Sequence, residues 1–321
     1  MKTKKFATTL LALAVGSASP LAAGLVDSDL PDYKKVFGVS GTLNSVGSDT
    51  LNNMMALWAE AFQAYYPNVK IQVEGKGSST APPALIEGTS QLGPMSRAMK
   101  DSEIDKFEKK FGYKPTNVSV AIDALAVFAN KDNPIKGLSL KQVDSTFSST
   151  YKRGGKPAKT WGDLGATGQW ASKPISLYGR NSASGTYGFF KKVALLGGDF
   201  STSVKEQPGS SAVVQGISSD IGGLGYSGIG YKTSGVKALQ LSGDEGGLFE
   251  PTAENCISGD YPLARTLFIY CNKAPNKKLD KLTSEFLKFT LSKQGQEIVA
   301  KDGYYPLPAV IAAQIRESLL K

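Results

Sequence analysis

The chain of 321 residues contains no histidine. Within a single chain, this absence excludes a Ser-His-Asp hydrolase, a Cys-His protease and any metal centre ligated by histidine. Two stretches come close to functional motifs but fail them: Ile229 replaces the second glycine of a nucleophile elbow that would begin at Gly225, and Tyr231 interrupts a phosphate-binding loop. We therefore expect a binding protein rather than an enzyme, with no catalytic residue, metal or cofactor.

Beyond its first residues the sequence has no apolar run of about twenty residues, the length that a membrane-spanning helix needs. Those first residues follow the pattern of a signal peptide, because basic residues precede an apolar core and a small-residue cleavage region. The three parts are Lys2, Lys4 and Lys5, then Phe6–Val15, then Pro20–Ala23. We expect residues 1–23 to be removed and the mature protein to be soluble and periplasmic, with secretion from the cell as an additional destination.

Cysteine is scarce, since only Cys256 and Cys271 are present. No cysteine lies near the expected new N-terminus, so a lipid anchor on such a residue is excluded. In an exported chain the two cysteines could form a disulfide that stabilises the fold by roughly 3 kcal/mol. The alternative is a pair of buried free thiols, and two cysteines without histidine make a poor zinc site. We expect the disulfide.

Basic residues are in modest excess over acidic ones. Without the three lysines of the signal segment, the 37 basic residues fall to 34 against 28 acidic ones, a formal charge of +6. This excess suits an anionic partner. The lysines are scattered and form no basic stripe with aromatic residues between them, so nucleic acid is not expected as a partner.

Short apolar strands alternate with amphipathic helices, which predicts an α/β fold with mostly parallel sheets. Val69, Ile71 and Val73 alternate as a strand does. An apolar helical face precedes them, and its members are core residues: Leu51, Met54, Met55, Trp58, Phe62 and Tyr65.

Two further runs, Val118–Ala129 and Leu267–Cys271, are nearly all apolar and predict strands buried on both faces. About 300 mature residues are near the limit for one core, so two lobes are expected, with the two buried strands as the crossings of a hinge. The predicted division is 24–123 with 262–321 as lobe I, and 124–261 as lobe II.

Four turns between strands and helices are rich in serine, threonine and glycine: Val46–Leu51, Gly75–Leu85, Leu92–Met99 and Gly179–Phe190. Each could be a simple helix cap, because hydroxyl side chains satisfy free amides there. Such turns converge, however, at the carboxyl ends of strands in open α/β sheets, and helix N-termini with hydroxyls bind anions. Four of them, two with an arginine, favour an oxyanion site in a cleft. The glycine-rich run Ile221–Tyr231 is better explained by tight turns than by a phosphate loop.

At these residues the sequence resembles the periplasmic phosphate-binding proteins of ABC-type phosphate importers, the PstS type. The resemblance covers essentially the whole mature chain, through Leu57–Phe62, Gly77–Thr80, Ala121–Pro134, Thr146–Gly165, Gly179–Thr186, Gly223–Tyr231 and Tyr261–Asn272. It implies a two-lobed periplasmic-binding-protein fold of type II, with the ligand cleft between the lobes. It also implies a monomer that binds inorganic phosphate and delivers it to permease subunits in the inner membrane.

The resemblance also assigns site residues. In the family an arginine, three intervening residues and then Ser-Gly-Thr contact phosphate, and this pattern maps onto Arg180, Ser184, Gly185 and Thr186. The other turns then supply further donors: Ser78 from one, and Thr50 with Ser48 from the first.

One departure from the family pattern concerns the proton of bound phosphate. Many members accept it with an aspartate after a strand end where this chain has Ser96 and Arg97. Ser96 and Arg97 are therefore expected at the site, with the alternative that Arg97 only forms a salt bridge. The acceptor carboxylate is then Asp123, a lone acid in an apolar strand, or Asp49. If Asp123 is not the acceptor, it is expected to bond to backbone between the lobes, because a buried carboxylate needs a partner. If Asp49 is not the acceptor, it is expected to be a helix N-cap.

The expected mechanism is capture without chemistry: two lobes close around dehydrated phosphate, and the transporter recognises the closed, loaded form. Three rival functions remain open. They are binding of another oxyanion such as sulfate or molybdate, an exported phosphatase, and a secreted phosphate-scavenging or adhesion protein.

Overall fold

The structure, a computed structural model, describes residues 25–244 and 246–320, so the predicted signal peptide lies outside the described residues. Its strands are β1 Gly41–Gly47, β2 Val69–Gly75, β3 Gly93–Met95, β4 Thr116–Asn130, β5 Gly137–Ser139, β6 Ser176–Arg180, β7 Lys205–Gln207, β8 Gly223–Gly228, β9 Val236–Ala238, β10 Gln240–Ser242 and β11 Ala264–Cys271. Its α-helices are α2 Asn52–Tyr65, α3 Ala81–Glu87, α4 Asp101–Phe111, α5 Leu140–Phe147, α6 Gly185–Val193, α7 Ser210–Ser219, α8 Ala253–Ser258, α9 Lys281–Thr290, α10 Lys293–Lys301 and α11 Ala309–Leu320. Among the described residues, no helix is long and apolar enough to cross a membrane.

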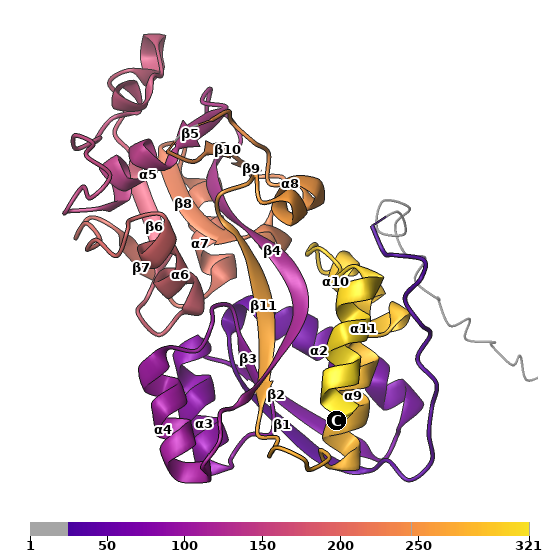
Figure 1. Cartoon of the computed structure of the whole chain (residues 1–321). Helices are drawn as coiled ribbons and strands as arrows, with labels where there is room; N and C mark the ends of the chain where they lie inside the picture. Colours follow the sequence, from indigo (N-terminus) through magenta and orange to yellow (C-terminus); the bar gives the residue numbers. More distant parts are fainter. Residues whose placement is uncertain (1–24, 245, 321) are drawn as a thin grey trace, which may run out of the picture.

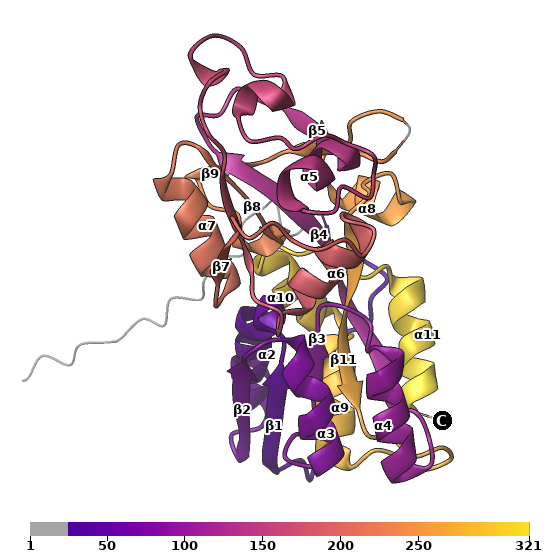
Figure 2. The same cartoon turned by 90° about the vertical axis from the view of Figure 1, so that its left-hand side faces the viewer.

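The molecule has two lobes joined by two long strands. Lobe I contains β1–β3 with α2–α4 and α9–α11, and lobe II contains β5–β10 with α5–α8. Strands β4 and β11 run side by side from one lobe into the other (Figure 1). The view turned by 90° shows the same division, with α6 of lobe II facing β3 and α3 of lobe I (Figure 2). The fold is the predicted two-lobed α/β fold, with the two buried strands as its crossings.

The prediction of mostly parallel sheets is wrong around the hinge. The central sheet has the order β3-β11-β4-β8-β6-β7, with β9 also beside β4, and both crossing strands pair antiparallel with their neighbours. Parallel pairs occur away from the crossings, as β1 with β2, β5 with β10, and β6 with β7 and β8. The reason is that the chain enters lobe II along β4 and returns along β11, so neighbouring crossing strands must run in opposite directions.

Each lobe has its own hydrophobic cores. The predicted apolar face of α2 packs into the main core of lobe I, where Trp58 and Phe62 are fully buried. Along β4, Val118, Val120 and Ala121 belong to this core, whereas Ala124 to Ala129 belong to the cores of lobe II. The same change occurs along β11, because Leu263 packs in lobe II and Leu267 in lobe I. A strand that is buried in two successive cores needs mostly apolar side chains, as β4 has apart from polar residues such as Ser119 and Asp123.

The predicted disulfide is wrong, because Cys256 and Cys271 are both free. Cys256 lies on α8 in the core of lobe II, and Cys271 ends β11 in the core of lobe I. The seven steps from Ala264 to Cys271 along an extended strand span about 23 Å. A disulfide requires Cα atoms within about 7 Å, so the strand that separates the lobes also separates the thiols. Burial raises the pKa of each thiol to about 12.

Candidate functional site

Three serines of lobe I meet where three chain segments end. Ser48 follows β1, Ser96 follows β3, and Ser78 opens the short 3₁₀ helix Ser78–Thr80. The Ser48 hydroxyl donates to Ser96 Oγ at 3.0 Å, and Ser78 Oγ lies 3.3 Å from the same atom and accepts from the Ser96 amide at 3.0 Å. All three side chains are buried. The strand-end turns therefore converge as predicted.

Lobe II contributes the N-terminus of α6 to the same place. Ser184 caps this helix by accepting hydrogen bonds from the amides of Thr186 and Tyr187. The Thr186 hydroxyl lies 2.9 Å from the hydroxyl of Thr50, which belongs to lobe I. The two lobes therefore touch through their hydroxyl groups. We call Ser48, Thr50, Ser78, Ser96, Ser184 and Thr186 the hydroxyl cluster.

Gly185 permits this approach of the lobes. A Cβ atom at this position would lie 2.1 Å from Ser78 Oγ, 2.8 Å from Ser78 Cβ and 2.6 Å from Ser96 Oγ. These separations are shorter than any van der Waals contact, and Ser78 Cβ cannot rotate away. A second close contact lies beside it, where the amide of Ser79 donates to the carbonyl of Ala183 across the lobes at 3.1 Å. Glycine is needed here because no side chain fits between the lobes.

Arg180, at the end of β6, reaches from lobe II to lobe I. Its Nη1 donates to Asp49 Oδ2 at 2.9 Å and to Ser210 Oγ at 2.7 Å, and Nη2 donates to the carbonyl of Pro208. The side chain is 1% exposed, and its Nε has no hydrogen-bond partner among the described residues. Burial lowers the pKa of Arg180, whereas Asp49 acts to raise it. The buried Nε–H group of this guanidinium is thus free for a ligand.

Asp49 is an interlobe partner rather than a helix cap. Ser48, not Asp49, caps the first short helix, by accepting from the amide of Thr50. Besides Arg180, Asp49 Oδ2 accepts from both the amide and the hydroxyl of Ser210, at 2.9 and 2.8 Å. Its other oxygen, Oδ1, has no hydrogen bond among the described residues. One oxygen of Asp49, the residue between Ser48 and Thr50 in the chain, is therefore available to accept a hydrogen bond.

Asp123 is fully buried on β4 and pairs with Arg265 on β11, the residue directly opposite in the strand register. Arg265 donates to Asp123 Oδ2 from Nε at 2.8 Å and from Nη2 at 2.7 Å, and the amide of Ile229 donates to Oδ1. The sequence analysis missed Arg265. The sequence pattern that could have identified it is a single arginine in one apolar crossing strand and a single aspartate in the other.

Arg97 stands apart from the cluster. Its guanidinium forms a two-pronged ion pair with Glu103, at 2.7 and 2.8 Å, and also donates to the carbonyl of Ala98 and to Ser79 Oγ. Burial acts to raise the pKa of Glu103, but hydrogen bonds from Arg97 and the Lys100 amide outweigh it and lower that pKa. Of the two readings of Arg97, the geometry favours the salt bridge.

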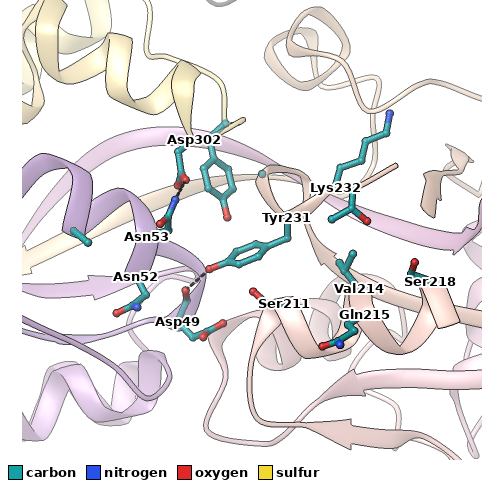
Figure 3. A pocket seen from close by; sticks show the side chains of 14 residues that line it. Asp49, Asn52, Asn53, Ser211, Val214, Gln215, Ser218, Tyr231, Lys232 and Asp302 are labelled. Carbon is teal, nitrogen blue, oxygen red and sulfur yellow. Dashed lines mark hydrogen bonds between the residues drawn. The ribbon is translucent and has the colours of Figure 1, made fainter. Parts of the chain in front are cut away.

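Two cavities lie beside these residues. One, of 960 Å³, is lined from lobe I by Arg97–Asp101, from lobe II by Ser182, Ser184 and Tyr187–Phe189, and from β11 by Arg265. The other, of 770 Å³, lies between Asp49 with α2 on one side and α7 with Tyr231 on the other. In Figure 3, Tyr231 reaches toward Asp49, whose carbonyl accepts its hydroxyl hydrogen at 2.8 Å. Within residues 25–244 and 246–320, no group of three or more Cys, Asp or Glu side chains could hold a metal ion.

Comparisons with known proteins place this architecture in a family. Residues 38–294 match the family model of the PBP superfamily domain. The chain is 58% identical to the phosphate-binding protein PstS of Pseudomonas aeruginosa PAO1, over 99% of both chains. This chain belongs to the PstS family.

Solved structures of phosphate-binding proteins agree with this membership. A Clostridium perfringens substrate-binding protein of the ABC-transporter class, solved with bound phosphate, is 26% identical with a TM-score of 0.71, covering 83% of this chain and 100% of that one. A phosphate transport receptor from Vibrio cholerae, at 22% identity, shares the fold with a TM-score of 0.65, over 83% of this chain and 100% of that one. The resemblance to the PstS family noted in the sequence is therefore confirmed.

Proposed function

We propose that this protein binds inorganic phosphate between its lobes and delivers it to the permease of an ABC-type phosphate importer. It is a transport receptor of the PstS family, not an enzyme. The observation that carries the proposal is the buried set of donors where the lobes meet: the hydroxyl cluster, the N-terminus of α6 and an unpaired N–H of Arg180. Such a set suits a dehydrated oxyanion, because hydroxyls, amides and guanidinium groups all donate hydrogen bonds.

The proposed ligands combine both lobes. Lobe I offers Ser48, Thr50, Ser78 and Ser96, while lobe II offers Arg180, Ser184, Gly185 through its amide, and Thr186. Because the two halves of the site lie on different lobes, phosphate makes its full set of contacts only when the lobes are together. Ligand binding then favours the closed form, and the permease can recognise loading by recognising closure.

The acceptor for the phosphate proton is proposed to be Asp49. Both oxygens of Asp123 accept hydrogen bonds from the protein, whereas Oδ1 of Asp49 accepts none among the described residues. Phosphate near neutral pH carries a proton to donate, and sulfate does not. A required hydrogen bond of this kind can reject an analogue that lacks it by roughly 10⁴–10⁵. We therefore propose selectivity for phosphate over sulfate.

The lobe boundaries, the export, the oligomeric state and the location of the permease are proposed as the sequence predicts them. The lobe boundaries are proposed at 24–123 with 262–321 and at 124–261, supported by the change of core along β4 and β11. We also propose that residues 1–23 direct export to the periplasm, that the receptor is a monomer, and that its permease lies in the inner membrane.

Isothermal titration of ligand-stripped protein with phosphate, arsenate, sulfate and molybdate tests the function. Phosphate is expected to bind most tightly, arsenate less tightly, and sulfate and molybdate far more weakly. Tight binding of sulfate or molybdate with weak binding of phosphate would contradict the proposal and favour another oxyanion.

A further inference from the structure

Arg265 lies where lobe I, lobe II and the hinge meet. Its residue is 6% exposed, and Asp123 on the neighbouring strand fixes its guanidinium. From this position Nη1 donates to the carbonyl of Ser96 at 2.9 Å, and Nη2 donates to Thr186 Oγ1 at 3.0 Å. Ser96 and Thr186 are members of the hydroxyl cluster from opposite lobes. The guanidinium therefore borders the cluster directly, whereas Arg180 makes no hydrogen bond to any of its members.

The five N–H donors of Arg265 are not all committed. Asp123 takes one from Nε and one from Nη2, Thr186 takes the second from Nη2, and Ser96 takes one from Nη1. The second hydrogen of Nη1 has no partner in the part of the chain that the structure describes. The Thr186 hydroxyl also contacts the hydroxyl of Thr50. If the Thr186 side chain rotates toward Thr50, the Nη2–H of Arg265 that it now accepts becomes free to bind an anion. Two charged donors are thus available at the edge of the cluster.

A route to these donors is present. Arg265 and Ser184 both line the 960 Å³ cavity between the lobes. Its lining also includes Lys100, Lys191 and Lys192 with one acidic residue, Asp101, so basic residues are in excess there. Anions are attracted to such a cavity. An anion that enters it can reach the cluster and the guanidinium together.

We propose that Arg265 is a phosphate-binding residue and that Asp123 is the positioning residue that holds its guanidinium against the hydroxyl cluster. This inference rests on the proposed function, since it concerns the same site. It assigns Asp123 to holding the arginine instead of accepting the phosphate proton. It also gives the site a cation that does not depend on closure, because both partners lie on the crossing strands.

The test compares Asp123→Asn with the double variant Asp123→Asn/Arg265→Gln. Replacing Arg265 alone would leave a buried unpaired carboxylate, which is strongly destabilising, whereas the double variant leaves no buried charge. Arg153→Gln is the matched control, because Arg153 is a buried arginine of lobe II that donates to the carbonyls of Val193 and Ala194, outside the site. Titration with inorganic phosphate and thermal unfolding are measured for each protein.

Loss of a charge-assisted contact is expected to weaken phosphate binding of the double variant roughly tenfold to 100-fold relative to Asp123→Asn, with Arg153→Gln unchanged. In ¹⁵N spectra of the unsubstituted protein, phosphate should shift the Nε–Hε signal of Arg265 and leave that of Arg153 in place. Asp123→Asn should broaden the Arg265 signal, as expected when its anchor is weakened.

Equal phosphate affinity of the double variant and Asp123→Asn would overturn the inference, as would an Arg265 signal that phosphate does not move. If the unsubstituted protein binds no phosphate, the proposed function fails, and the role of Arg265 fails with it. The two failures are distinguishable because only the first occurs in a protein that still binds phosphate.

Discussion

The molecule contains two Arg–Asp ion pairs near the junction of its lobes, and they differ in what they join. Arg265 and Asp123 lie opposite each other on β11 and β4, so the strand register holds them together. Arg180 and Asp49 belong to different lobes and are 131 positions apart in the sequence. Moving the lobes apart leaves the first pair intact and breaks the second. The comparison teaches that one pair supplies a fixed cation, while the other forms only with closure.

The two aspartates are also bonded differently. Asp123 is fully buried with both oxygens engaged, whereas Asp49 has a side chain that is 21% exposed and one oxygen without a hydrogen bond among the described residues. A buried ion pair must be fully bonded to offset its desolvation, and Asp123 meets that requirement. Asp49 keeps a free lone pair that a protonated ligand can use.

Gly185→Ala is expected to have the largest effect on phosphate affinity. It should break the Arg180–Asp49 pair, which depends on closure, and leave the Arg265–Asp123 pair intact. The added methyl group would collide with Ser78 and Ser96 and hold the lobes apart. We expect phosphate affinity to fall by about 100-fold, the loss of roughly 3 kcal/mol of interlobe and ligand contacts. Titration gives the affinity, and small-angle scattering with excess phosphate gives the extent of closure.

Gly188→Ala is the matched control for this change. It lies on the same helix, and its Cβ would meet only the flexible Arg97 side chain, at 3.3 Å. It should bind phosphate as the unsubstituted protein does. A Gly185→Ala protein that still closes and binds normally would show that the lobes do not need this close approach.

Asp49→Asn and Asp123→Asn separate the two aspartates by selectivity. Asp49→Asn should reduce the ratio of phosphate to sulfate affinity by at least about tenfold, because an amide can donate to either anion. Asp123→Asn should weaken the binding of both anions together and leave the ratio unchanged, because it acts through Arg265. Titration of each variant with both anions gives the ratios. If the ratio of phosphate to sulfate affinity changes in Asp123→Asn and stays constant in Asp49→Asn, Asp123 is the acceptor of the phosphate proton and Asp49 is not.

A third aspartate sharpens the comparison, because Asp302 has no cationic partner among the described residues. It accepts a hydrogen bond from Asn53, beside the second cavity (Figure 3), and burial raises the pKa of Asp302 to about 6. Between about pH 4 and pH 6 the unfolded chain loses this proton while the folded chain keeps it. The contribution of Asp302 to the free energy of unfolding should therefore fall as the pH rises through this range.

Asp302→Asn should remove that fall and raise the free energy of unfolding at pH 7 by about 1–2 kcal/mol. Urea unfolding at pH 4 and pH 7 measures both quantities. A variant with the same pH dependence as the unsubstituted protein would show that Asp302 ionises in the folded state as it does in the unfolded chain.

The sequence predicts local features of the site well and distant pairings poorly. The spacing from Arg180 to Thr186 identifies a strand end followed by a helix N-terminus, because caps and glycine turns are local signals. Arg265 was missed because its partner is 142 residues away, and only the register of β4 against β11 brings them together. Cys256 and Cys271 show the opposite relation: they are close in the sequence, but a crossing strand keeps them apart in the structure. Arg97 follows a strand end as predicted, yet its guanidinium pairs with Glu103, six residues further on in the first turn of α4.

The most direct test of this account is a crystal structure of the protein with bound phosphate. The account predicts one phosphate ion between the lobes, hydrogen-bonded to hydroxyls of both lobes, to Nε of Arg180 and to Nη1 of Arg265, with the Arg265–Asp123 pair retained. A phosphate bound elsewhere, or one that lies beyond hydrogen-bond distance of Arg265, would contradict it.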